Sequence, residues 1–380
     1  MSGFTAHNTV LLIANKVPHY RVSVYNYLAR RFAQTGVKFV VASESRLRES
    51  DQPLNFEFHE EAFSFARYRR LVNTLRPRAV ILHLHLKISM FWPLLHWLKW
   101  KGIPVISWTK GGNLDEPGNR FRQALFNHTH RLSNALLLYS AAQSNLIPRT
   151  HRHKIFAANN TVNFEDYPEV PESKEEIKRA WDIPFQKVVL FTGTMGVGGE
   201  RKRVSHLIEI FRNLNREDVG LLLVGGGMSD TLKASVNPKN TLVLGAVHDP
   251  RNLKISQLFK ASDLFVVPGH VGLGINQAFY WGLPVITEAC HQPPEIQYLQ
   301  SGRSGFIVPD NDLVALRDKI LLLLDDDVLR AEFGRRAKTD IEQHASIEGM
   351  FQSFARAVEF VSAGAATDRC KGTPAPSAVV

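Results

Sequence analysis

The segment from Asp263 to Pro284 places the tightest limits on what this chain can fold into. Residues 264–267 form a short apolar run between an aspartate and a proline, which is typical of a buried strand. A glycine-containing loop follows, then a helix predicted over residues 275–281 and a second apolar run from residue 285. This order predicts a parallel α/β sheet with the loop at the carboxyl ends of the strands, where such sheets bind ligands.

The loop in this segment contains Gly269, Gly272 and Gly274. Glycines let backbone N–H groups approach an anion closely, and the N-terminus of the next helix adds partial positive charge. An ordinary strand-to-helix turn can contain the same glycines, so the loop alone slightly favours a purely structural role.

The same segment resembles the donor-binding signature of family 4 glycosyltransferases, and in particular of members that build bacterial surface polysaccharides. Six residues are in register with that signature: Gly272, Leu273, Ala278, Gly282, Pro284 and Val285. The two glutamates of the signature correspond here to Gly269 and Gln277. The resemblance implies the GT-B fold, an α/β fold of two facing Rossmann-like domains with parallel sheets and a C-terminal helix that crosses back.

The resemblance also implies a site for a nucleotide-sugar donor. The residues that it assigns to donor binding in this region are Gly269, His270, Val271, Gly272, Leu273, Gln277 and Glu295. We expect the neutral imidazole of His270 to donate a hydrogen bond to the donor sugar. A solvent-facing loop histidine is the alternative.

A second glycine-rich loop follows a strand predicted over residues 188–191 and precedes a helix predicted from about Val204. Its glycines are Gly193, Gly196, Gly198 and Gly199, and the cations Arg201, Lys202 and Arg203 come directly after them. This combination suits a diphosphate, although a basic hairpin without a ligand is the alternative. We expect the Lys202 side chain to be exposed beside that anion.

This loop resembles the family's segment in which an arginine and a lysine hold the donor diphosphate. Lys202 falls on the lysine and Thr194 on the arginine, a departure that Arg201 can make good. The resemblance therefore implies that Gly193, Arg201 and Lys202 bind the donor. Lys202 would also be catalytic, because it neutralises the charge of the leaving diphosphate without a metal. No cofactor and no metal are expected.

The first half of the chain has a β-α-β opening that places His19 and Arg21 at a carboxyl edge of a sheet. The loop resembles the Pro-x-Tyr-Arg opening of polysaccharide glycosyltransferases, which implies an acceptor-side role in which Arg21 pairs with a phosphate or carboxylate. The alternative, equally weighted, is that Arg21 caps the helix start or is solvated there.

Another loop, after a strand predicted over residues 104–108, carries Lys110 and Gly111. The resembling proteins have Trp-Gly-His-Gly here, with the histidine near the reacting sugar, so the resemblance implies a catalytic position for Lys110 and an acceptor-side position for Gly111. A lysine can act there as a point charge beside phosphate. His83 and His85 alternate along a further predicted strand, where two hydrogen-bonded histidines are favoured over a metal site.

Charge is concentrated in the first half of the chain. Residues 1–165 hold 22 Lys and Arg against 9 Asp and Glu, a balance of +13, whereas the remaining residues have a balance of −3. This asymmetry indicates an anionic partner, either an anionic membrane surface or a lipid-diphosphate acceptor, although a generally basic solvated surface competes with both. Nucleic acid is not expected, because no recognised binding module is visible.

Residues 88–100 are apolar and aromatic, with three tryptophans and flanking lysines. The segment is too short to span a bilayer. An interfacial helix is one interpretation, but a crossover helix packed on the sheet is favoured, because parallel strands need such a connection here.

The predicted domain organisation has five parts. Residues 1–163 form an acceptor-side Rossmann-like domain, 164–184 a linker, 185–345 a nucleotide-sugar-binding Rossmann-like domain, 346–363 a crossover helix on the first domain, and 364–380 a disordered tail. The linker contains a helix over residues 173–181 with a capping box of Ser173 and Glu176. No signal peptide is apparent, and two cysteines favour a reducing compartment.

Together these features predict a cytoplasmic hexosyltransferase, peripheral at the inner face of the cell membrane in one version of the hypothesis. It would move a sugar from a nucleotide-sugar to a glycan or lipid-linked acceptor in polysaccharide biosynthesis. Retention of the anomeric configuration is implied by the resemblance alone. Two alternatives stay open: a noncatalytic GT-B module that binds a glycan or a partner enzyme, and a nucleotide-sugar epimerase.

Overall fold

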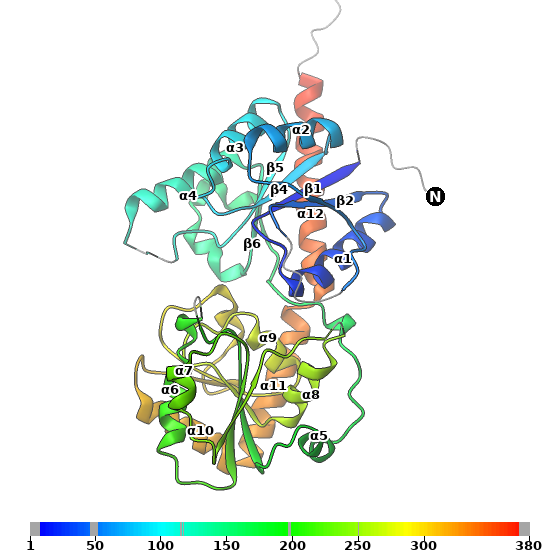
Figure 1. The fold of residues 1–380 in the computed structure, drawn as a ribbon. Coiled ribbons are helices and arrows are strands. Elements are labelled where there is room, and N and C mark those ends of the chain that lie inside the picture. The colour runs from blue at the N-terminus through cyan, green and yellow to red at the C-terminus, as the bar shows by residue number, and fades with distance from the viewer. Residues whose placement is uncertain are drawn as a thin grey trace, which may run out of the picture. The chain divides into compact units, whose positions relative to one another are not determined.

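The computed structural model describes residues 8–45, 52–114, 116, 118–196, 199–249 and 251–371, with side chains up to residue 363. The chain divides into two compact units (Figure 1). The first unit is Met1–Asn159 together with Ile347–Val380, and the second is Asn160–Ser346. Gly198 of the glycine-rich loop lies outside the described residues.

The first unit is built on a seven-stranded sheet in the order β3-β2-β1-β4-β5-β6-β7, and all of its pairs are parallel. Its strands are β1 (Thr9–Ala14), β2 (Lys38–Ser43), β3 (Glu57–Glu60), β4 (Ala79–His83), β5 (Val105–Thr109), β6 (Ala135–Leu138) and β7 (Ile155–Ala157). Its helices are α1 (His19–Gln34), α2 (Phe65–Leu75), α3 (Phe91–Trp100), α4 (Arg120–Leu132) and α12 (Ile347–Lys371), with the 3-10 helices η1 (Ala141–Leu146) and η2 (Arg149–Lys154).

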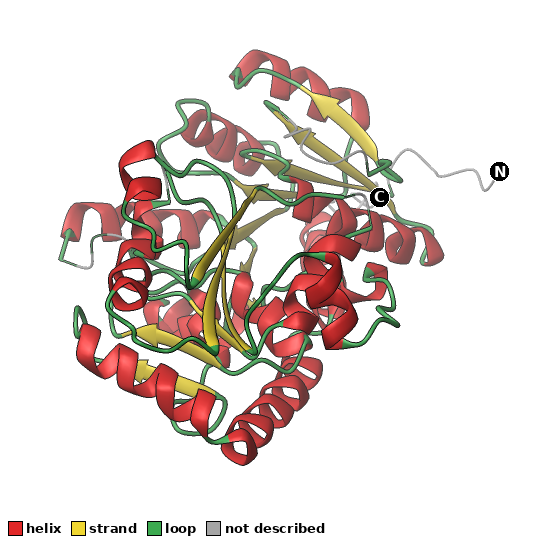
Figure 2. Cartoon of the chain, turned by 60° about the horizontal axis from the view of Figure 1, so that its bottom comes forward, coloured by secondary structure: helices red, strands yellow, loops and turns green. Residues whose placement is uncertain are grey.

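Strand β1 is apolar from Val10 to Ala14, because helices cover both faces of the sheet at this strand. Val10 and Leu12 pack with α1 and α12 on one face of the sheet, and Leu11 and Ile13 pack with α2 and α3 on the other. A strand that is covered on both faces has no solvent side, so it reads as a continuous apolar run. Helices accordingly lie on both faces of the sheets (Figures 1 and 2).

The C-terminal helix α12 belongs to the first unit, as the predicted fold class requires. Phe351 packs edge-on against Phe32 of α1 at 5.2 Å between ring centroids, and Phe354 packs edge-on against Trp108 at 5.0 Å. Helix α12 extends to Lys371. Residues 364–371 are therefore helical, and the prediction that they belong to a disordered tail is wrong; residues 372–380 lie outside the described part.

The second unit has a six-stranded parallel sheet in the order β10-β9-β8-β11-β12-β13. Its strands are β8 (Lys187–Thr192), β9 (Val219–Val224), β10 (Thr241–Gly245), β11 (Leu264–Val266), β12 (Val285–Glu288) and β13 (Gly305–Val308). Its helices are α5 (Lys174–Ala180), α6 (Val204–Arg212), α7 (Asp230–Ala234), α8 (Leu253–Ala261), α9 (Gly274–Tyr280), α10 (Leu313–Asp325) and α11 (Asp327–His344), with the 3-10 helices η3 (Phe164–Asp166), η4 (Glu200–Lys202) and η5 (Pro294–Tyr298).

Two local predictions are confirmed. The capping box of Ser173 and Glu176 is present at the start of α5. The aromatic segment forms α3, which connects β4 to β5 and packs Phe91, Leu94, Leu95 and Leu98 against the sheet, so the crossover-helix interpretation is confirmed. Within the described residues, no helix combines the length and the apolar character needed to cross a bilayer.

Candidate functional site

Two loops of the second unit lie side by side at the carboxyl ends of β8 and β11. The backbone N–H of Gly269 donates to the carbonyl of Lys202 at 3.1 Å, and the N–H of His270 donates to the carbonyl of Arg201 at 2.8 Å. These two bonds join the glycine loop of the Asp263–Pro284 segment to the basic loop after β8. The structure thus brings together two loops that are about 70 residues apart in sequence.

Glycine is required at position 269 because the two loops approach so closely. A Cβ added to Gly269 would lie 1.8 Å from the carbonyl oxygen of Arg201, a backbone atom that cannot move aside. The position at which the resembling signature has a glutamate is therefore closed to any side chain here. In contrast, a Cβ added to Gly272 would meet nothing within 4 Å, although its φ of +57° favours glycine.

Lys202 lies across Gly193, the first residue after β8. A Cβ on Gly193 would be 2.5 Å from Cε of Lys202, and Nζ donates to the carbonyl oxygen of His270 at 3.3 Å. Burial, reinforced by the charge of the neighbouring Arg201 guanidinium, lowers the pKa of Lys202 to about 8. Lys202 is half-buried, so the prediction that its side chain is exposed is wrong.

The cationic end of the basic loop forms the short 3-10 helix η4, and α6 starts at Val204 as predicted. Arg203 joins the two helices in a left-handed conformation, with φ of 54° and ψ of 40°. Lys202 is therefore the last residue of a tight turn. Its backbone position depends on how Arg203 is held.

Glu288, at the end of β12, holds Arg203 and was not singled out by the sequence. Its side chain is fully buried and accepts from Nη1 of Arg203 at 2.5 Å and from the backbone N–H of Asn311 at 3.2 Å. Nδ1 of His206 lies 2.6 Å from its other oxygen. Arg203 also pairs with Asp310, and this hydrogen bond raises the pKa of Arg203. A buried carboxylate is stable only with such partners.

The Gln292 side chain forms hydrogen bonds to the loop that carries His270. Its side-chain oxygen accepts from the N–H of Val271 at 3.1 Å, and its amide nitrogen donates to the carbonyl of Gly269 at 2.9 Å and to Oγ1 of Thr287 at 2.8 Å. One amide side chain thus fixes the backbone on both sides of His270. The His270 side chain itself is half-buried, with its ring 6.4 Å from that of His291.

Other residues that the sequence assigns to the donor have partners inside the second unit. Nε2 of Gln277 donates to the hydroxyl of Tyr167 at 2.6 Å. The buried carboxylate of Glu295 accepts from the side chain of Asn160. Val271 is fully buried, and Leu273 directly precedes α9. The assignment of these residues to donor binding stays a prediction.

In the first unit, Trp108 at the end of β5 is the centre of an aromatic and cationic cluster. The imidazole of His83 stacks on it at 4.2 Å between centroids, and the guanidinium of Arg21 lies 4.9 Å from the ring centroid. Arg21 is only 4% exposed, so the alternative in which it is solvated at the helix start is wrong. His19 begins α1 and is half-buried.

His83 is a neutral hydrogen-bonding group. Its Nε2 contacts the hydroxyl of Tyr139, and burial, reinforced by the charges of Arg21 and then of nearby His85 and Lys110, lowers the pKa of His83 to about 3. His85 is exposed, and its backbone N–H donates to Oδ1 of Asn15 at 2.7 Å. Among the side chains that the structure describes, no three His, Cys, Asp or Glu are grouped so as to hold a metal ion.

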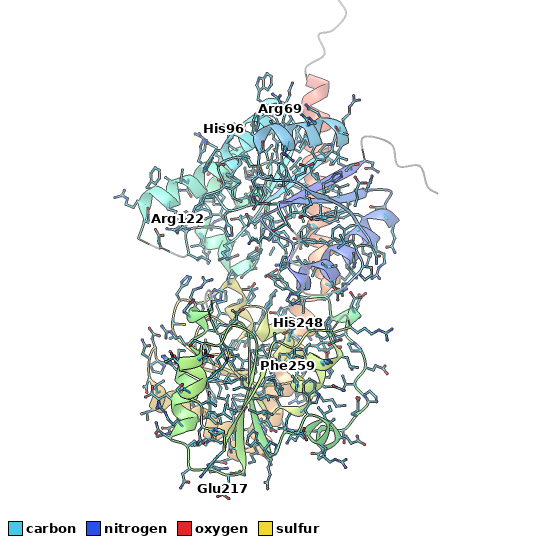
Figure 3. All side chains as sticks on the ribbon, viewed as in Figure 1. Arg69, His96, Arg122, Glu217, His248 and Phe259 are labelled. Carbon is cyan, nitrogen blue, oxygen red and sulfur yellow. The ribbon has the colours of Figure 1, made fainter. Side chains whose placement is uncertain are left out.

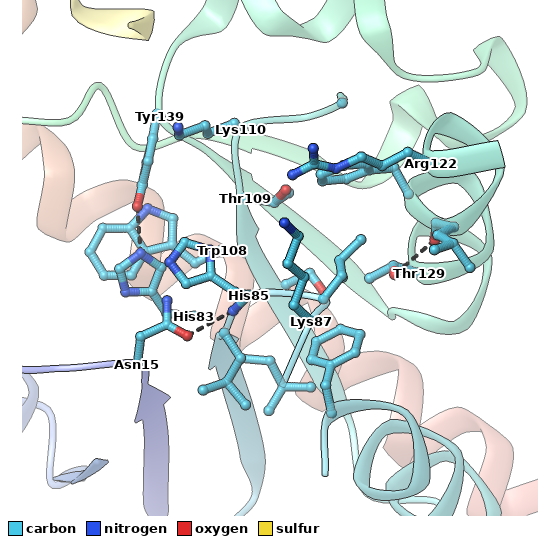
Figure 4. A pocket seen from close by; sticks show the side chains of 18 of the residues that line it. Asn15, His83, His85, Lys87, Trp108, Thr109, Lys110, Arg122, Thr129 and Tyr139 are labelled. Atoms are coloured by element: carbon cyan, nitrogen blue, oxygen red, sulfur yellow. Dashed lines mark hydrogen bonds between the residues drawn. The ribbon is translucent and has the colours of Figure 1, made fainter. Parts of the chain in front are cut away.

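Beside this cluster lies a pocket of about 630 Å³ that is formed within the first unit (Figure 4). It lies at the carboxyl ends of β4 and β5 and is lined by the start of α3 and by α4 from Phe121 to Thr129. Lys110 lines it, as do Lys87 and Arg122, neither of which the sequence assigned to a pocket. Gly111 follows with φ of +81°, and a Cβ there would lie 3.2 Å from the carbonyl of Gln143.

Comparison with known proteins finds sequence similarity to glycosyltransferases. A profile of the family described as "Glycosyl transferases group 1" matches residues 186–326. The chain is 21% identical over 251 residues to a poly(ribitol-phosphate) alpha-N-acetylglucosaminyltransferase of Staphylococcus aureus, covering 64% of this chain and 47% of that protein. It is 26% identical over 223 residues to the capsular polysaccharide biosynthesis glycosyltransferase CapM of Staphylococcus aureus, covering 54% and 56%. The chain thus spans about half the length of these curated relatives.

Solved structures match over nearly the whole chain. The structure of Anabaena Alr3699/HepE in complex with UDP-glucose has a TM-score of 0.71 at 13% identity, covering 93% of this chain and all of that one. At this level of identity the match concerns the fold. The chain has the GT-B fold, with two Rossmann-like units and parallel sheets of seven and six strands, and the predicted fold class is confirmed.

Proposed function

We propose that this protein is a glycosyltransferase that takes its sugar from a nucleotide-sugar bound to the second unit. The observation that carries the proposal is the convergence of Gly193, Lys202 and the His270 loop at the carboxyl edge of the sheet. A half-buried ammonium beside the backbone of two adjoining loops is suited to a diphosphate, because the ammonium and the backbone N–H groups can act on one anion. The family profile covers this segment, and a matching structure was solved with UDP-glucose.

The proposed chemistry is departure of the nucleoside diphosphate from the sugar. Negative charge develops on the leaving diphosphate, and Lys202 with the exposed Arg201 stabilises it without proton transfer. His270 would contact the sugar, and Gln292 hydrogen-bonds the backbone on both sides of it. Retention of the anomeric configuration and the transfer of a hexose are the finer parts of the proposal and are supported by the family resemblance.

The acceptor is proposed to bind the first unit. Lys110, Gly111, His19 and Arg21 lie at the carboxyl edge of its sheet, and Lys110 lines the pocket. Lys110 would act there as a point charge. Two curated relatives are named for polysaccharide or poly(ribitol-phosphate) substrates, which supports a glycan or lipid-linked acceptor in polysaccharide biosynthesis.

A peripheral position at the inner face of the cell membrane is part of the same proposal. The balance of +13 in residues 1–165 supports attraction to anionic lipid. Cosedimentation of the full chain with anionic and with neutral vesicles tests this. We expect binding to the anionic vesicles only, weakening as salt rises, and equal binding to both would exclude it.

A noncatalytic GT-B module is the second candidate, favoured by the residues at the two glutamate positions of the signature. Gly269 stands where the signature has a glutamate and has no room for any side chain, while Gln277, at the second glutamate position, is bound to Tyr167. A nucleotide-sugar epimerase is less well supported. The carboxylates described at this site already have partners: Glu288 binds Arg203 and His206, Asp310 binds Arg203, and Glu295 binds Asn160.

The deciding experiment is a thermal-shift and calorimetric screen of the full chain against UDP, GDP and their sugars, followed by assay of donor consumption. Binding with release of nucleoside diphosphate supports the transferase. Binding without turnover in the presence of candidate acceptors supports the noncatalytic module. Conversion of the bound nucleotide-sugar to its epimer supports the third candidate.

A further inference from the structure

We infer that the pocket of the first unit takes an amphiphile, with an alkyl or isoprenyl chain on its apolar walls and a phosphate at its cationic rim. This inference rests on the proposed function, because it names the chemical class of the acceptor: a phosphate-linked lipid rather than a free glycan. It is argued from the residues that line the pocket.

The walls of the pocket are mainly hydrocarbon. They come from the segment that joins β4 to α3 and from the facing side of α4: Leu84, Leu86, Phe91, Phe121, Leu125 and Phe126. A free glycan presents many hydroxyls, which lose their water in such a pocket without enough hydrogen-bond partners in return. A hydrocarbon chain loses no hydrogen bonds there and is removed from water.

Phe121 gives this pocket an unusually apolar edge. The residue is 75% exposed at the start of α4, although it also lines the pocket. A large exposed aromatic ring next to an apolar pocket is typical of a surface that becomes covered when a ligand binds. A chain longer than the pocket would continue over this ring.

The charged groups of the pocket select an anion. Lys87, Lys110 and Arg122 line it, and the one carboxylate among its described lining residues is Glu116. Glu116 accepts from Nη1 of Arg122 at 2.6 Å and from the Asn119 side chain at 2.9 Å. Three cations against one engaged carboxylate leave an excess of positive charge in the pocket.

The positions of Lys87 and Arg122 favour one shared headgroup, whereas the Lys110 side chain extends toward Tyr139 (Figure 4). Figure 4 shows the side chains of Lys87 and Arg122 extending toward Thr109, which precedes Lys110 at the end of β5. The phosphate would therefore lie near Thr109, and the chain would run along α4. His83, whose pKa is about 3, stays neutral beside it and adds no charge.

Direct binding to the full chain tests the inference, independently of any transfer reaction. The probes are dodecyl phosphate, used below its critical micelle concentration, dodecyl maltoside and inorganic phosphate. A site that recognises both the alkyl chain and the phosphate should bind dodecyl phosphate roughly 10- to 100-fold more tightly than dodecyl maltoside, because only the phosphate makes charge-assisted contacts. Inorganic phosphate, which has the charge but not the chain, is expected to bind more weakly still.

Matched variants locate the site. Phe121→Ser and Lys87→Glu change exposed lining residues and are expected to weaken dodecyl phosphate binding at least fivefold. Trp100→Ser removes an equally exposed ring, 76% accessible, from α3 outside the lining, and Arg69→Glu reverses an exposed charge on α2 (Figure 3). Both controls should leave the affinity unchanged.

Each other outcome overturns the inference in a distinguishable way. Equal binding of inorganic and dodecyl phosphate would mean an anion site that does not recognise a chain. Equal loss in the pocket variants and in the controls would mean adsorption to a basic surface. No binding of dodecyl phosphate, with nucleoside diphosphate still bound through Lys202, would reject the lipid acceptor while leaving the proposed transferase intact.

Discussion

The side chain of Lys202 passes directly over the α-carbon of Gly193, so closely that a Cβ on Gly193 would be 2.5 Å from the lysine Cε. This relationship links the end of strand β8 to the only lysine of the basic loop. Because Gly193 also has φ of +143°, a larger residue there is strained by its backbone and would displace the lysine side chain. The Lys202 side chain can therefore occupy this position because Gly193 has no Cβ.

Replacing Lys202 with alanine should weaken binding of nucleoside diphosphate by roughly 10- to 100-fold, because a hydrogen bond to a charged group contributes about 1.5–3 kcal/mol. Binding of the nucleoside without phosphates should change little. Titration calorimetry of both ligands against both proteins measures this. The same loss for both ligands would indicate a damaged fold, and unchanged binding of both would leave Lys202 a structural residue.

The affinity for nucleoside diphosphate should fall as the pH rises above about 8. Burial lowers the Lys202 pKa to about 8 in the free protein, whereas a bound anion favours the protonated form. Above pH 8 binding must therefore take up a proton, and the affinity drops by up to about tenfold per pH unit. Calorimetry in buffers of different ionisation enthalpy detects this proton.

Lys202→Arg is the control for that pH dependence, since an arginine stays charged throughout the range. Its affinity should be nearly flat between pH 7 and pH 9. A wild-type profile that is equally flat would show that the protonation of Lys202 is not linked to the diphosphate.

Gly269→Ala should damage the loop pair far more than Gly272→Ala. The first substitution forces a Cβ to 1.8 Å from the Arg201 carbonyl, whereas the second costs only the strain of a positive φ, about 1 kcal/mol. We expect a clear drop in melting temperature and loss of nucleotide binding for Gly269→Ala alone. Gly269→Glu, which restores the residue of the resembling signature, should be at least as harmful. Tolerance of glutamate at position 269 would contradict the close approach.

The sequence predicted the elements that depend on local pattern. Strand β8, the following glycine loop and the start of α6 at Val204 could be placed because an apolar run, glycines and cations follow one another within a short stretch. The burial of Lys202 could not, because it depends on the His270 loop, 68 residues away. The place of Lys87 and Arg122 in the pocket could not be predicted for the same reason, because it depends on how β4, β5 and α4 come together.

Glu288→Gln should destabilise the second unit and weaken nucleotide binding together. The carboxylate is fully buried and is the shared partner of Arg203 and His206, so its loss removes two charge-assisted contacts. Because Arg203 is partly exposed and keeps its pair with Asp310, we expect the free energy of unfolding in urea to fall by about 1–3 kcal/mol. Nucleotide binding should weaken because the turn that carries Lys202, directly before Arg203, is held less firmly.

Asp310→Asn provides the comparison for Glu288. Asp310 pairs with the same guanidinium but is 45% exposed, so its replacement should cost less than about 1 kcal/mol and leave binding intact. If Asp310→Asn proved as costly as Glu288→Gln, the buried carboxylate would not be the group that positions the loop.

His130 should make the protein less stable in mild acid. It is fully buried on α4, and neither ring nitrogen has a hydrogen-bond partner among the described residues. Burial, followed by the charges of His151 and Lys154, lowers its pKa to about 4 from an ordinary 6.5. Between these values the unfolded chain takes up a proton that the folded chain does not, so the free energy of unfolding falls with falling pH by up to ~1.4 kcal/mol per pH unit.

His130→Leu removes this contribution and the two unpaired nitrogens, so its gain in unfolding free energy over wild type, measured in urea, should grow from pH 7 to pH 4.5. His153→Leu, at an exposed histidine of η2, should leave the wild-type slope unchanged. His83 contributes in the same direction, with a pKa of about 3, so part of the acid sensitivity should persist in His130→Leu. A gain that is independent of pH would mean that His130 costs stability through packing rather than through protonation.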